Sequence, residues 1–452
     1  MSPLHCKGVQ SRMNRMHLSG IAKTVLCVFI GIHCSIGQTF LSLDDAIKTG
    51  LENNFGIRII RNEASIAVNN HTLGNAGFLP EISIAGGYET SVKKADVKVV
   101  SGTELSENAA STDWIDAGIF LDWTLFDGMN MFVNRSRLKT LREMGELGIR
   151  LEMEKTLAGI VVLYHDIIRH QMMEKVLGDQ VELSTERLRI AETRSRIGAT
   201  SELEYLRAQV DLNADELALI QQQTLINNAR IALNEILSRD ISLTFQVEDT
   251  ILLQDHLDIN DLREECLLSN TELQRVRLNT ELDQLELKNL EGIRYPVLAL
   301  HSGYNFLENE TEASFIEYNR QLGPFVGLSL QFMLFDGMNR NREVQNARIS
   351  IENAELSEQE LQLALLSRVG QHYNQYESEL RVIDLEKHNL ALAEKNMDIA
   401  AESYRIGTLS SIELREIQEN LLEAQGRMIR ALFRVKVQET ELLRLSGALL
   451  PR

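Results

Sequence analysis

Residues whose types and spacing suit acid–base, nucleophilic or metal chemistry are sparse in this 452-residue chain. His170 and Glu174 stand one helical turn apart, a spacing that would let them share a metal ion. On a charged helix face the same spacing is far more often solvated surface. The chain contains neither a GxxxxGK[ST] phosphate loop nor an HExxH zinc helix. The sequence therefore predicts no enzyme, no cofactor and no metal site.

The cysteines offer no disulfide framework. Residues 1–37 are typical of a secretory signal peptide, with four basic residues ahead of the apolar run TVLCVFIGI and small residues at the cleavage site. Removal of this segment leaves Cys266 as the single cysteine of a mature chain that begins at Gln38. Ordinary cleavage is favoured over lipidation of Cys34, because His33 stands where a lipoprotein signal needs a small residue. Translation from Met1 or from Met16 gives the same mature chain.

The charge balance excludes one class of partner. The chain has 46 basic and 65 acidic residues, a formal net charge of −19, and loss of the four basic residues of the signal lowers it to −23. So acidic a chain repels nucleic acid. No run after the signal reaches the 18 or more apolar residues of a spanning helix. The exported chain is therefore periplasmic, secreted, or inserted in a membrane as β-strands.

The chain is an internal duplication. The hexapeptide LFDGMN occurs at 125–130 and again at 334–339, and the tripeptide RIG recurs at the same offset of 209, at 196–198 and 405–407. An upstream set recurs at an offset of 216, in which Asn54, Pro80 and Tyr88 match Asn270, Pro296 and Tyr304. We predict a first repeat at 38–240 and a second at 257–452, joined by a linker at 241–256.

Strand patterning precedes each LFDGMN. Apolar and polar residues alternate with period two over 116–125 and over 326–334, and a second strand follows each proline, at 82–90 and 297–306. Polar loops are expected between the paired strands, containing SGTELSENAAST and LENETEAS. Strands of about ten residues with one apolar face are long enough to cross a bilayer. On pattern alone, half-buried strands of a soluble sandwich remain equally open.

Helical patterning follows each LFDGMN. Apolar residues recur at helical spacing from Leu138 onwards, and no proline interrupts 131–195, which predicts a helix of ~98 Å at 1.5 Å per residue. In each Asp-Gly pair the aspartate is expected to cap this helix and the glycine to ease the bend. The four residues of these strand-to-helix junctions are Asp127, Gly128, Asp336 and Gly337.

Each long helix is expected to end in a tight hairpin. Gly198 and Gly407 suit a left-handed C-cap. Shortly after them, Ser201 with Glu204, and Ser410 with Glu413, have the S-x-x-E spacing of a capping box. Each repeat is thus predicted to contain a helix, two strands, a long helix, a tip and a returning helix, with the tips at 194–204 and 403–416. Four membrane strands cannot close a barrel that needs eight or more, so oligomerisation is required.

The ordered set of cues resembles the TolC-like outer-membrane efflux proteins over nearly the whole mature length. These cues are the tandem halves, Leu79-Pro80 and Tyr295-Pro296 ahead of the first strands, the LFDG closings, and the run Tyr404-Arg405-Ile406-Gly407 at the second tip. The resemblance implies a mainly α fold with β: a homotrimeric outer-membrane β-barrel, four strands per chain, continued by a long periplasmic α-helical barrel. It further implies a passive export conduit that works with a periplasmic adaptor (membrane fusion) protein and an inner-membrane pump, in efflux or type I secretion.

The resemblance also implies site residues. By position the tips line the periplasmic entrance, where Glu204, Glu413 and Glu416 match acidic positions that narrow the pore in relatives. The remaining tip residues carried over are Arg196, Gly198, Tyr404, Arg405 and Gly407. The match is incomplete, because Thr200 and Leu409 stand where some relatives have a latching arginine.

A periplasmic coiled-coil adaptor or structural spacer is the alternative function. It would also be helical, rich in hairpins and exported. It would not need four amphipathic strands of membrane length, and it usually needs an inner-membrane anchor or a lipid. Contact with outer-membrane lipid is therefore expected of a channel and not of a spacer.

Overall fold

A computed structural model of the protein describes residues 39–98, 100–254, 257–312, 316 and 318–450. The expected signal peptide, the start at Gln38 and Cys34 lie outside these residues. Two runs of the same element order follow one another. The first consists of α1 (Leu43–Asn53), α2 (Phe55–Asn70), β2 (Glu81–Lys98), β3 (Glu104–Phe126), α3 (Asn130–Arg196) and α4 (Glu202–Ile236). The second consists of α5 (Ile259–Ser269), α6 (Thr271–Gly292), β5 (Val297–Thr311), β6 (Tyr318–Gln331), α7 (Asn339–Ile406) and α8 (Ser411–Ser446). The short strands β1 (Thr39–Phe40) and β4 (Phe245–Gln246) stand outside the two runs.

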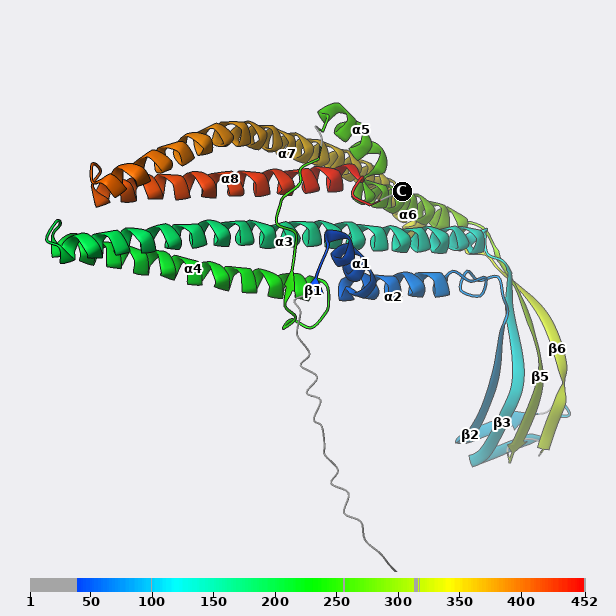
Figure 1. The fold of residues 1–452 in the computed structure, drawn as a ribbon. Helices are drawn as coiled ribbons and strands as arrows, with labels where there is room; N and C mark the ends of the chain where they lie inside the picture. The colour runs from blue at the N-terminus through cyan, green and yellow to red at the C-terminus, as the bar shows by residue number, and fades with distance from the viewer. Residues whose placement is uncertain (1–38, 99, 255–256, 313–315, 317, 451–452) are drawn as a thin grey trace, which may run out of the picture. The chain divides into compact units, whose positions relative to one another are not determined.

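The four long strands form one antiparallel sheet in the order β2-β3-β5-β6 (Figure 1). The two hairpins have the same register: Ile84 pairs with Ile119 in the first, and Leu300 pairs with Leu328 in the second. The offset of 216 relates Ile84 to Leu300, and the offset of 209 relates Ile119 to Leu328. The middle junction, β3 with β5, is where the first run meets the second.

The strands are longer than their apolar alternation indicates. Most of the segment expected as a polar loop at 101–112 belongs to β3, which starts at Glu104, and β5 continues to Thr311 through the start of LENETEAS. The backbone ladder persists there because an antiparallel pair is held by main-chain hydrogen bonds, which polar side chains do not prevent. At the other end β6 stops at Gln331, short of the expected Leu334, because Gln331 is opposite the first residue of β5.

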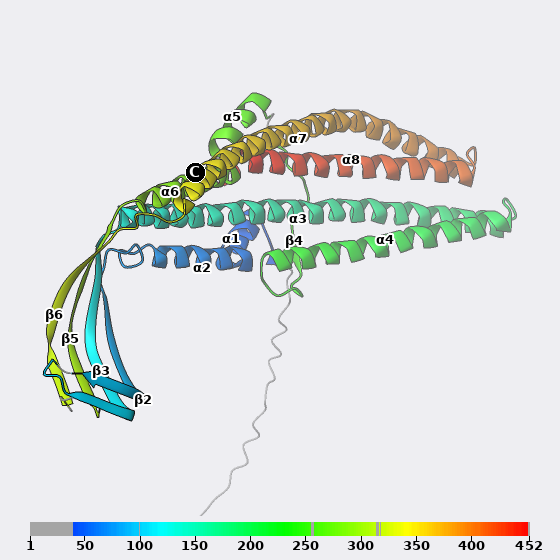
Figure 2. The ribbon, with the colours of Figure 1, turned by 180° about the vertical axis from the view of Figure 1, so that it is seen from behind.

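The long helices have 67 and 68 residues, and each has shorter helices packed along it (Figures 1 and 2). The single helix expected ahead of Pro80 is instead two, separated at Asn54, and the second run is separated in the same way at Asn270. Each asparagine leaves helical geometry, with ψ of 127° and 121°, and its side chain caps the next helix. A cap of this kind starts a helix without any proline to mark it in sequence.

Three apolar cores hold the described helices together, and the smallest lies near the tips around Tyr404. The first gathers α1, α3, α4 and the segment around β4, with Tyr164 buried at its centre and its hydroxyl donating to the carbonyl of Leu41 (2.9 Å). Burial raises the pKa of Tyr164 to about 12, so this hydroxyl stays a donor. The second gathers α5, α6, α7 and α8 around Tyr376, which stands 212 residues further on. None of the helices in the described residues is both long and apolar enough to span a membrane.

Candidate functional site

The second hairpin tip has the local geometry that its sequence predicts. Gly407 ends α7 with φ of 89°, in the left-handed region, and its N–H donates to the carbonyls of Ser403 and Tyr404 (both 3.1 Å). Ser410 and Glu413 then form a full capping box at the start of α8: the serine Oγ accepts from the Glu413 N–H (3.3 Å), and the carboxylate accepts from the Ser410 N–H (2.9 Å). These hydrogen bonds from Ser410 lower the pKa of Glu413, so the carboxylate is held in the cap in its charged form.

The first tip differs at one point. Gly198 is left-handed, with φ of 74°, and α4 starts after Ser201 as expected. The expected capping box is absent, because the Ser201 side chain makes no cap bond and Glu204 bonds to Ser201 only through its backbone (3.1 Å). Glu204 is half-buried and close to Tyr404. Burial first, and the charge of Glu204 in addition, raise the pKa of Tyr404.

Two of the three candidate acids share one groove. A cavity of about 410 Å³ lies between the first turns of α4 and α8. Glu204 and Glu416 both line it, whereas Glu413 does not. The other lining residues are Arg207, Asp211, Ser411, Ile412, Arg415 and Glu419. The groove therefore has four carboxylates against two guanidinium groups.

A buried ion-pair network lies beside this groove and joins the two hairpins. Arg415 on α8 donates to both oxygens of Asp215 on α4 (2.7 and 3.0 Å), and Asp215 also accepts from the Ser184 hydroxyl on α3 (2.5 Å). Burial opposes the charge of Arg415, but the bonds to Asp215 and Glu419 raise the pKa of its guanidinium. Sequence reasoning missed this network, because the two partners are 200 residues apart and have no motif.

The arginines of the two RIG tripeptides act locally, and a third arginine joins the tips. Arg196 pairs with Glu192 (2.6 Å), and Arg405 pairs with Glu402 (2.9 Å), each one turn away on its own helix. Arg194 instead donates to the carbonyl of Tyr404 (2.7 Å), with its guanidinium carbon 4.9 Å from the centre of the Tyr404 ring. The tips are thus joined by a hydrogen bond and a cation–π contact.

The two Asp-Gly junctions share a backbone path and differ in side-chain bonding. Each glycine and the methionine after it are left-handed, with φ between 66° and 73°. Asp336 accepts from the backbone N–H of Arg340 in the first turn of α7 (3.0 Å), although the N-cap position itself is occupied by Met338. Asp127 makes no such bond, and its Oδ1 is buried without a hydrogen-bond partner. The end of α6 packs tightly against the first junction: a Cβ on Gly128 would lie 2.0 Å from the carbonyl oxygen of Gly292.

A metal site at His170 is not supported by the contacts of this residue. Its two ring nitrogens lie 2.8 Å from an Arg169 nitrogen and 2.9 Å from the Gln222 side-chain nitrogen, so both are already engaged. Burial lowers the pKa of this imidazole. Within the described residues, no group of three His, Cys, Asp or Glu side chains could hold a metal ion.

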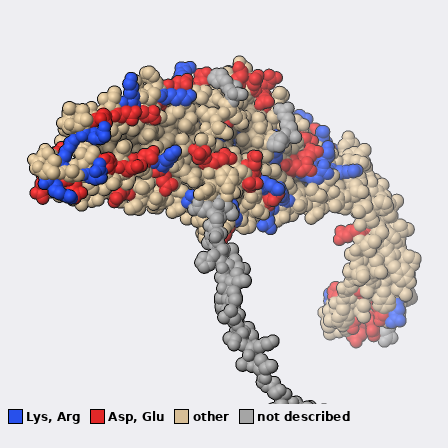
Figure 3. Space-filling view, in the orientation of Figure 1, with Lys and Arg blue, Asp and Glu red and all other residues tan. Residues whose placement is uncertain are grey.

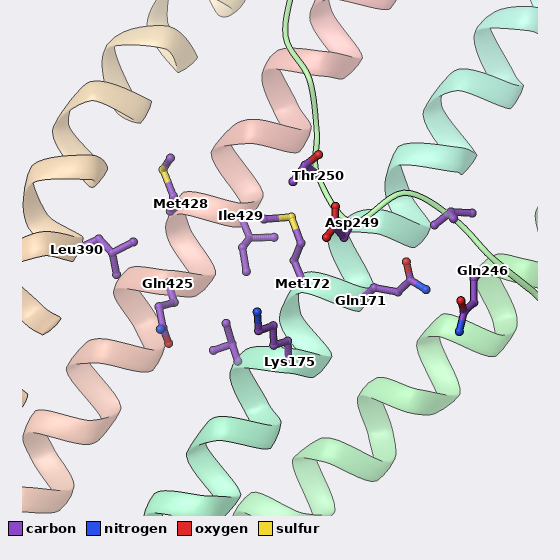
Figure 4. Close-up of a pocket in the computed structure, with 12 residues that line it drawn as sticks. Gln171, Met172, Lys175, Gln246, Asp249, Thr250, Leu390, Gln425, Met428 and Ile429 are labelled. Carbon is purple, nitrogen blue, oxygen red and sulfur yellow. The ribbon is translucent and has the colours of Figure 1, made fainter. Parts of the chain in front are cut away.

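A second cavity, of about 510 Å³, lies away from the tips where the linker passes α3, α7 and α8 (Figure 4). Met172 and Ile429 form part of its apolar wall, and Lys175 and Asp249 give it one charge of each sign. It shares no lining residue with the tip groove.

Comparisons with known proteins agree with this architecture. Residues 262–448 match the family model described as outer membrane efflux protein. The chain is 18% identical to outer membrane protein TolC of Salmonella enteritidis, over 94% of this chain and 87% of that one, and 20% identical to protein CyaE of Bordetella pertussis, over 83% and 78%. Among solved structures it is similar to the outer-membrane channel OprN (TM-score 0.74, 17% identity, 90% of both chains). It is also similar to the Campylobacter jejuni CmeC outer membrane channel (TM-score 0.75, 16% identity, 90% of this chain and 85% of that one).

Proposed function

The chain is a TolC-like outer-membrane efflux protein, and we propose that three copies of it close one barrel that conducts solutes from the periplasm to the outside. The protein is a channel subunit of the outer membrane that extends into the periplasm. The spacer alternative does not account for this family match or for the four-stranded sheet.

The sheet has two open edges, β2 and β6, and only four strands. An isolated sheet with such edges exposes unpaired backbone groups, which cannot be tolerated in a bilayer. Four strands are also too few to close on themselves. Pairing of each β6 with β2 of the next copy satisfies both edges once the ring closes, and three copies give the twelve strands of a small barrel.

The join between the two halves predicts how copies meet. Within the chain, β3 of the first half pairs with β5 of the second, with Ile119 opposite Tyr304. Since both hairpins have the same register, β6 should pair with β2 of the next copy in the way that β3 pairs with β5. Applying the two offsets converts Ile119 into Leu328 and Tyr304 into Tyr88. The proposed contact between copies therefore sets Leu328 opposite Tyr88 of the next copy.

One face of the sheet suits lipid. Ile84 is 83% exposed and Leu328 is 67% exposed, which is unusual for large apolar side chains in water. Figure 3 shows charged side chains over the helices and at the far end of the strands, with few over the middle of the strands on the face in view. The opposite face carries Asp116, Asp122 and, on the neighbouring strand opposite Asp122, His301, and it suits an aqueous lumen.

The tips suit the entrance of the conduit. Three copies would bring six hairpins around one axis, with the groove acids Glu204 and Glu416 of each chain close to it. Like charges in a narrow ring produce a strong local field that attracts cations. The periplasmic adaptor and inner-membrane pump are proposed to meet the channel at this end, as partners of the assembled trimer.

Disulfide trapping tests the proposed register. Opposite residues in an antiparallel pair have Cβ atoms about 4.5–5.5 Å apart, so Leu328→Cys combined with Tyr88→Cys should give covalent trimers in outer-membrane preparations under mild oxidation. Burial raises the pKa of the native Cys266 thiol to about 11, which keeps it out of the exchange. The control pair, Leu328→Cys with Val92→Cys, lies on the same face but is displaced by about 13 Å along the strand. Equal crosslinking of both pairs, or none of the first, would refute the register.

A further inference from the structure

Three polar side chains on neighbouring strands form a hydrogen-bonded chain that the conduit does not require. His301 on β5 has its Nδ1 2.5 Å from Asp122 Oδ1 on β3 and its Nε2 2.8 Å from Ser329 Oγ on β6. The order serine, imidazole, carboxylate is that of a nucleophilic triad, which is recognised by its geometry and not by its position in sequence. All three residues lie within one chain, so the observation does not depend on the proposed trimer.

The sheet register brings these residues together. Asp122 is directly opposite His301, whereas Ser329 is opposite Ala299, two residues from His301 on the same face. The imidazole therefore reaches diagonally across the β5–β6 pair, within the roughly 7–8 Å that separates such neighbours. Gly327, opposite His301, has open space where a Cβ would be, so nothing from that position blocks the approach to Ser329.

The contacts assign each residue a role. A carboxylate can only accept, so Asp122 orders the ring with its proton on Nδ1. Nε2 is then left as the acceptor for the Ser329 hydroxyl, which is the arrangement of a general base on a nucleophile. Glu81 on β2 stands next to Asp122 across the β2–β3 pair and adds a second negative charge on the side where the imidazolium would form.

We infer that Ser329 is an activated nucleophile that attacks electrophilic acyl or phosphonyl esters reaching the polar face of the sheet. In this step Oγ bonds to the acyl carbon or to phosphorus while its proton passes to His301 Nε2. The imidazolium then returns the proton to the leaving group, which departs as an alcohol or as hydrogen fluoride. The serine ester remains on the protein.

The surroundings select the class of substrate. Ser329 lies on a strand whose backbone pairs with β5, and the triad has no helix N-terminus beside it in the part of the chain that the structure describes. Backbone N–H groups of β6 point within the plane of the sheet, towards β5 or towards the open edge, so they are not directed at the polar face. Thr124 and Gln331 are neutral side chains on that face that offer hydrogen bonds. Compounds with good leaving groups therefore react, and the adduct accumulates because its hydrolysis is slow.

Labelling with a biotinylated fluorophosphonate tests the inference on the detergent-solubilised full chain. One adduct per chain is expected, mapped to Ser329 by mass spectrometry and lost in Ser329→Ala. His301→Gln should slow labelling about 100-fold, the lower range for removal of a general base. Asp122 is a positioning residue, so Asp122→Asn should be labelled at a rate between that of the parent and that of His301→Gln.

Ser302 is a matched control inside the same molecule. It lies next to His301 on β5, on the other face, and its hydroxyl donates to the Phe325 carbonyl (3.0 Å). It should stay unlabelled while Ser329 reacts. Labelling of both serines at one rate, or labelling of Ser329 that His301→Gln leaves unchanged, would overturn the inference. Because the comparison is made within one folded protein, neither result depends on channel activity.

Discussion

The side-chain nitrogen of Asn54 donates a hydrogen bond of 2.8 Å to the carbonyl oxygen of Ile236, the last residue of α4. The oxygen of the same side chain accepts from the Ile57 N–H (3.1 Å) and caps α2. The side-chain amide of Asn54 therefore joins the end of α4 to the start of α2. Asn270 repeats both bonds in the second half, to Leu445 (3.0 Å) and from Leu273 (3.0 Å).

The two functions of Asn54 can be separated by substitution. Asn54→Asp keeps the acceptor of the cap and loses the donor to Ile236, whereas Asn54→Ala loses both. We expect Asn54→Ala to lower the free energy of unfolding by about 2 kcal/mol and Asn54→Asp by about 1 kcal/mol. Denaturant unfolding followed by circular dichroism measures both. An unchanged free energy of unfolding in Asn54→Asp would show that the bridge to α4 contributes nothing, and equal losses in the two variants would show that the cap on α2 contributes nothing.

Removal of the charge on Asp215 should loosen the tips. Asp215→Asn leaves Arg415 without its buried partner, and we expect a loss of about 3 kcal/mol of local stability. Amide hydrogen exchange should accelerate at 180–215 and around Arg415. Residues far from this ion pair should exchange at the rate of the parent. Glu216→Gln changes an exposed neighbour by the same charge and should have no effect. Adding Arg415→Gln to Asp215→Asn should restore part of the loss, since no buried charge then stays unpaired.

The tip acids should govern ion selectivity. Because Glu413 is held in its capping box and Glu416 lines the open groove, Glu416→Gln is the cleaner probe. We expect this variant, and to a greater degree Glu413→Gln with Glu416→Gln, to reduce cation selectivity in planar bilayers. Both should weaken block by multivalent cations added from the periplasmic side.

The matched control for this experiment is Glu264→Gln, an exposed glutamate on α5. If the double variant remains oligomeric and conducts with the selectivity and block of the parent, the acids are solvated helix starts and do not line an entrance.

Buried His165 should make the helices sensitive to acid. Burial lowers the pKa of its imidazole to about 4, with Lys436 acting in the same direction. Its pKa is about 6.5 in the unfolded chain, so only the unfolded state binds the proton between these values. The free energy of unfolding should therefore fall as pH drops from about 6.5 to about 4, by roughly 3 kcal/mol from this group.

Thermal unfolding at about pH 7 and about pH 4.5, on either side of most of this window, checks the dependence. His165→Leu should flatten the profile, whereas substitution of the exposed His388 by glutamine should not. A profile that His165→Leu leaves unchanged would assign the acid sensitivity to other groups.

The fold class is predictable from sequence because each element carries its own period. Alternation over 116–125 and helical spacing from Leu138 onwards distinguish strand from helix, and the α-rich fold with a four-stranded sheet is as expected. The breaks at Asn54 and Asn270 escape sequence reasoning because no proline marks either of them. Alternation alone also makes the strands too short, since main-chain pairing continues where alternation stops.

The candidate site is less accessible to sequence reasoning. Ser201 and Ser410 have the same spacing to a glutamate, yet only Ser410 forms the capping box. Glu204 is close enough to Tyr404 of the other hairpin for its charge to act on that phenol, a tertiary relationship that the local sequence does not encode. The Asp215–Arg415 pair is likewise set by the packing of two hairpins, and no local pattern encodes it.

The equal registers of the two hairpins bear on the linear order of the halves. If the contact between copies repeats the contact between halves, each half has the same kind of neighbour on both sides. The arrangement of the halves in the assembled ring is then the same whichever half comes first in the chain. A circularly permuted gene that keeps the signal peptide, starts the mature chain at residue 257 and places residues 39–256 after 448 through a new linker should assemble the same channel.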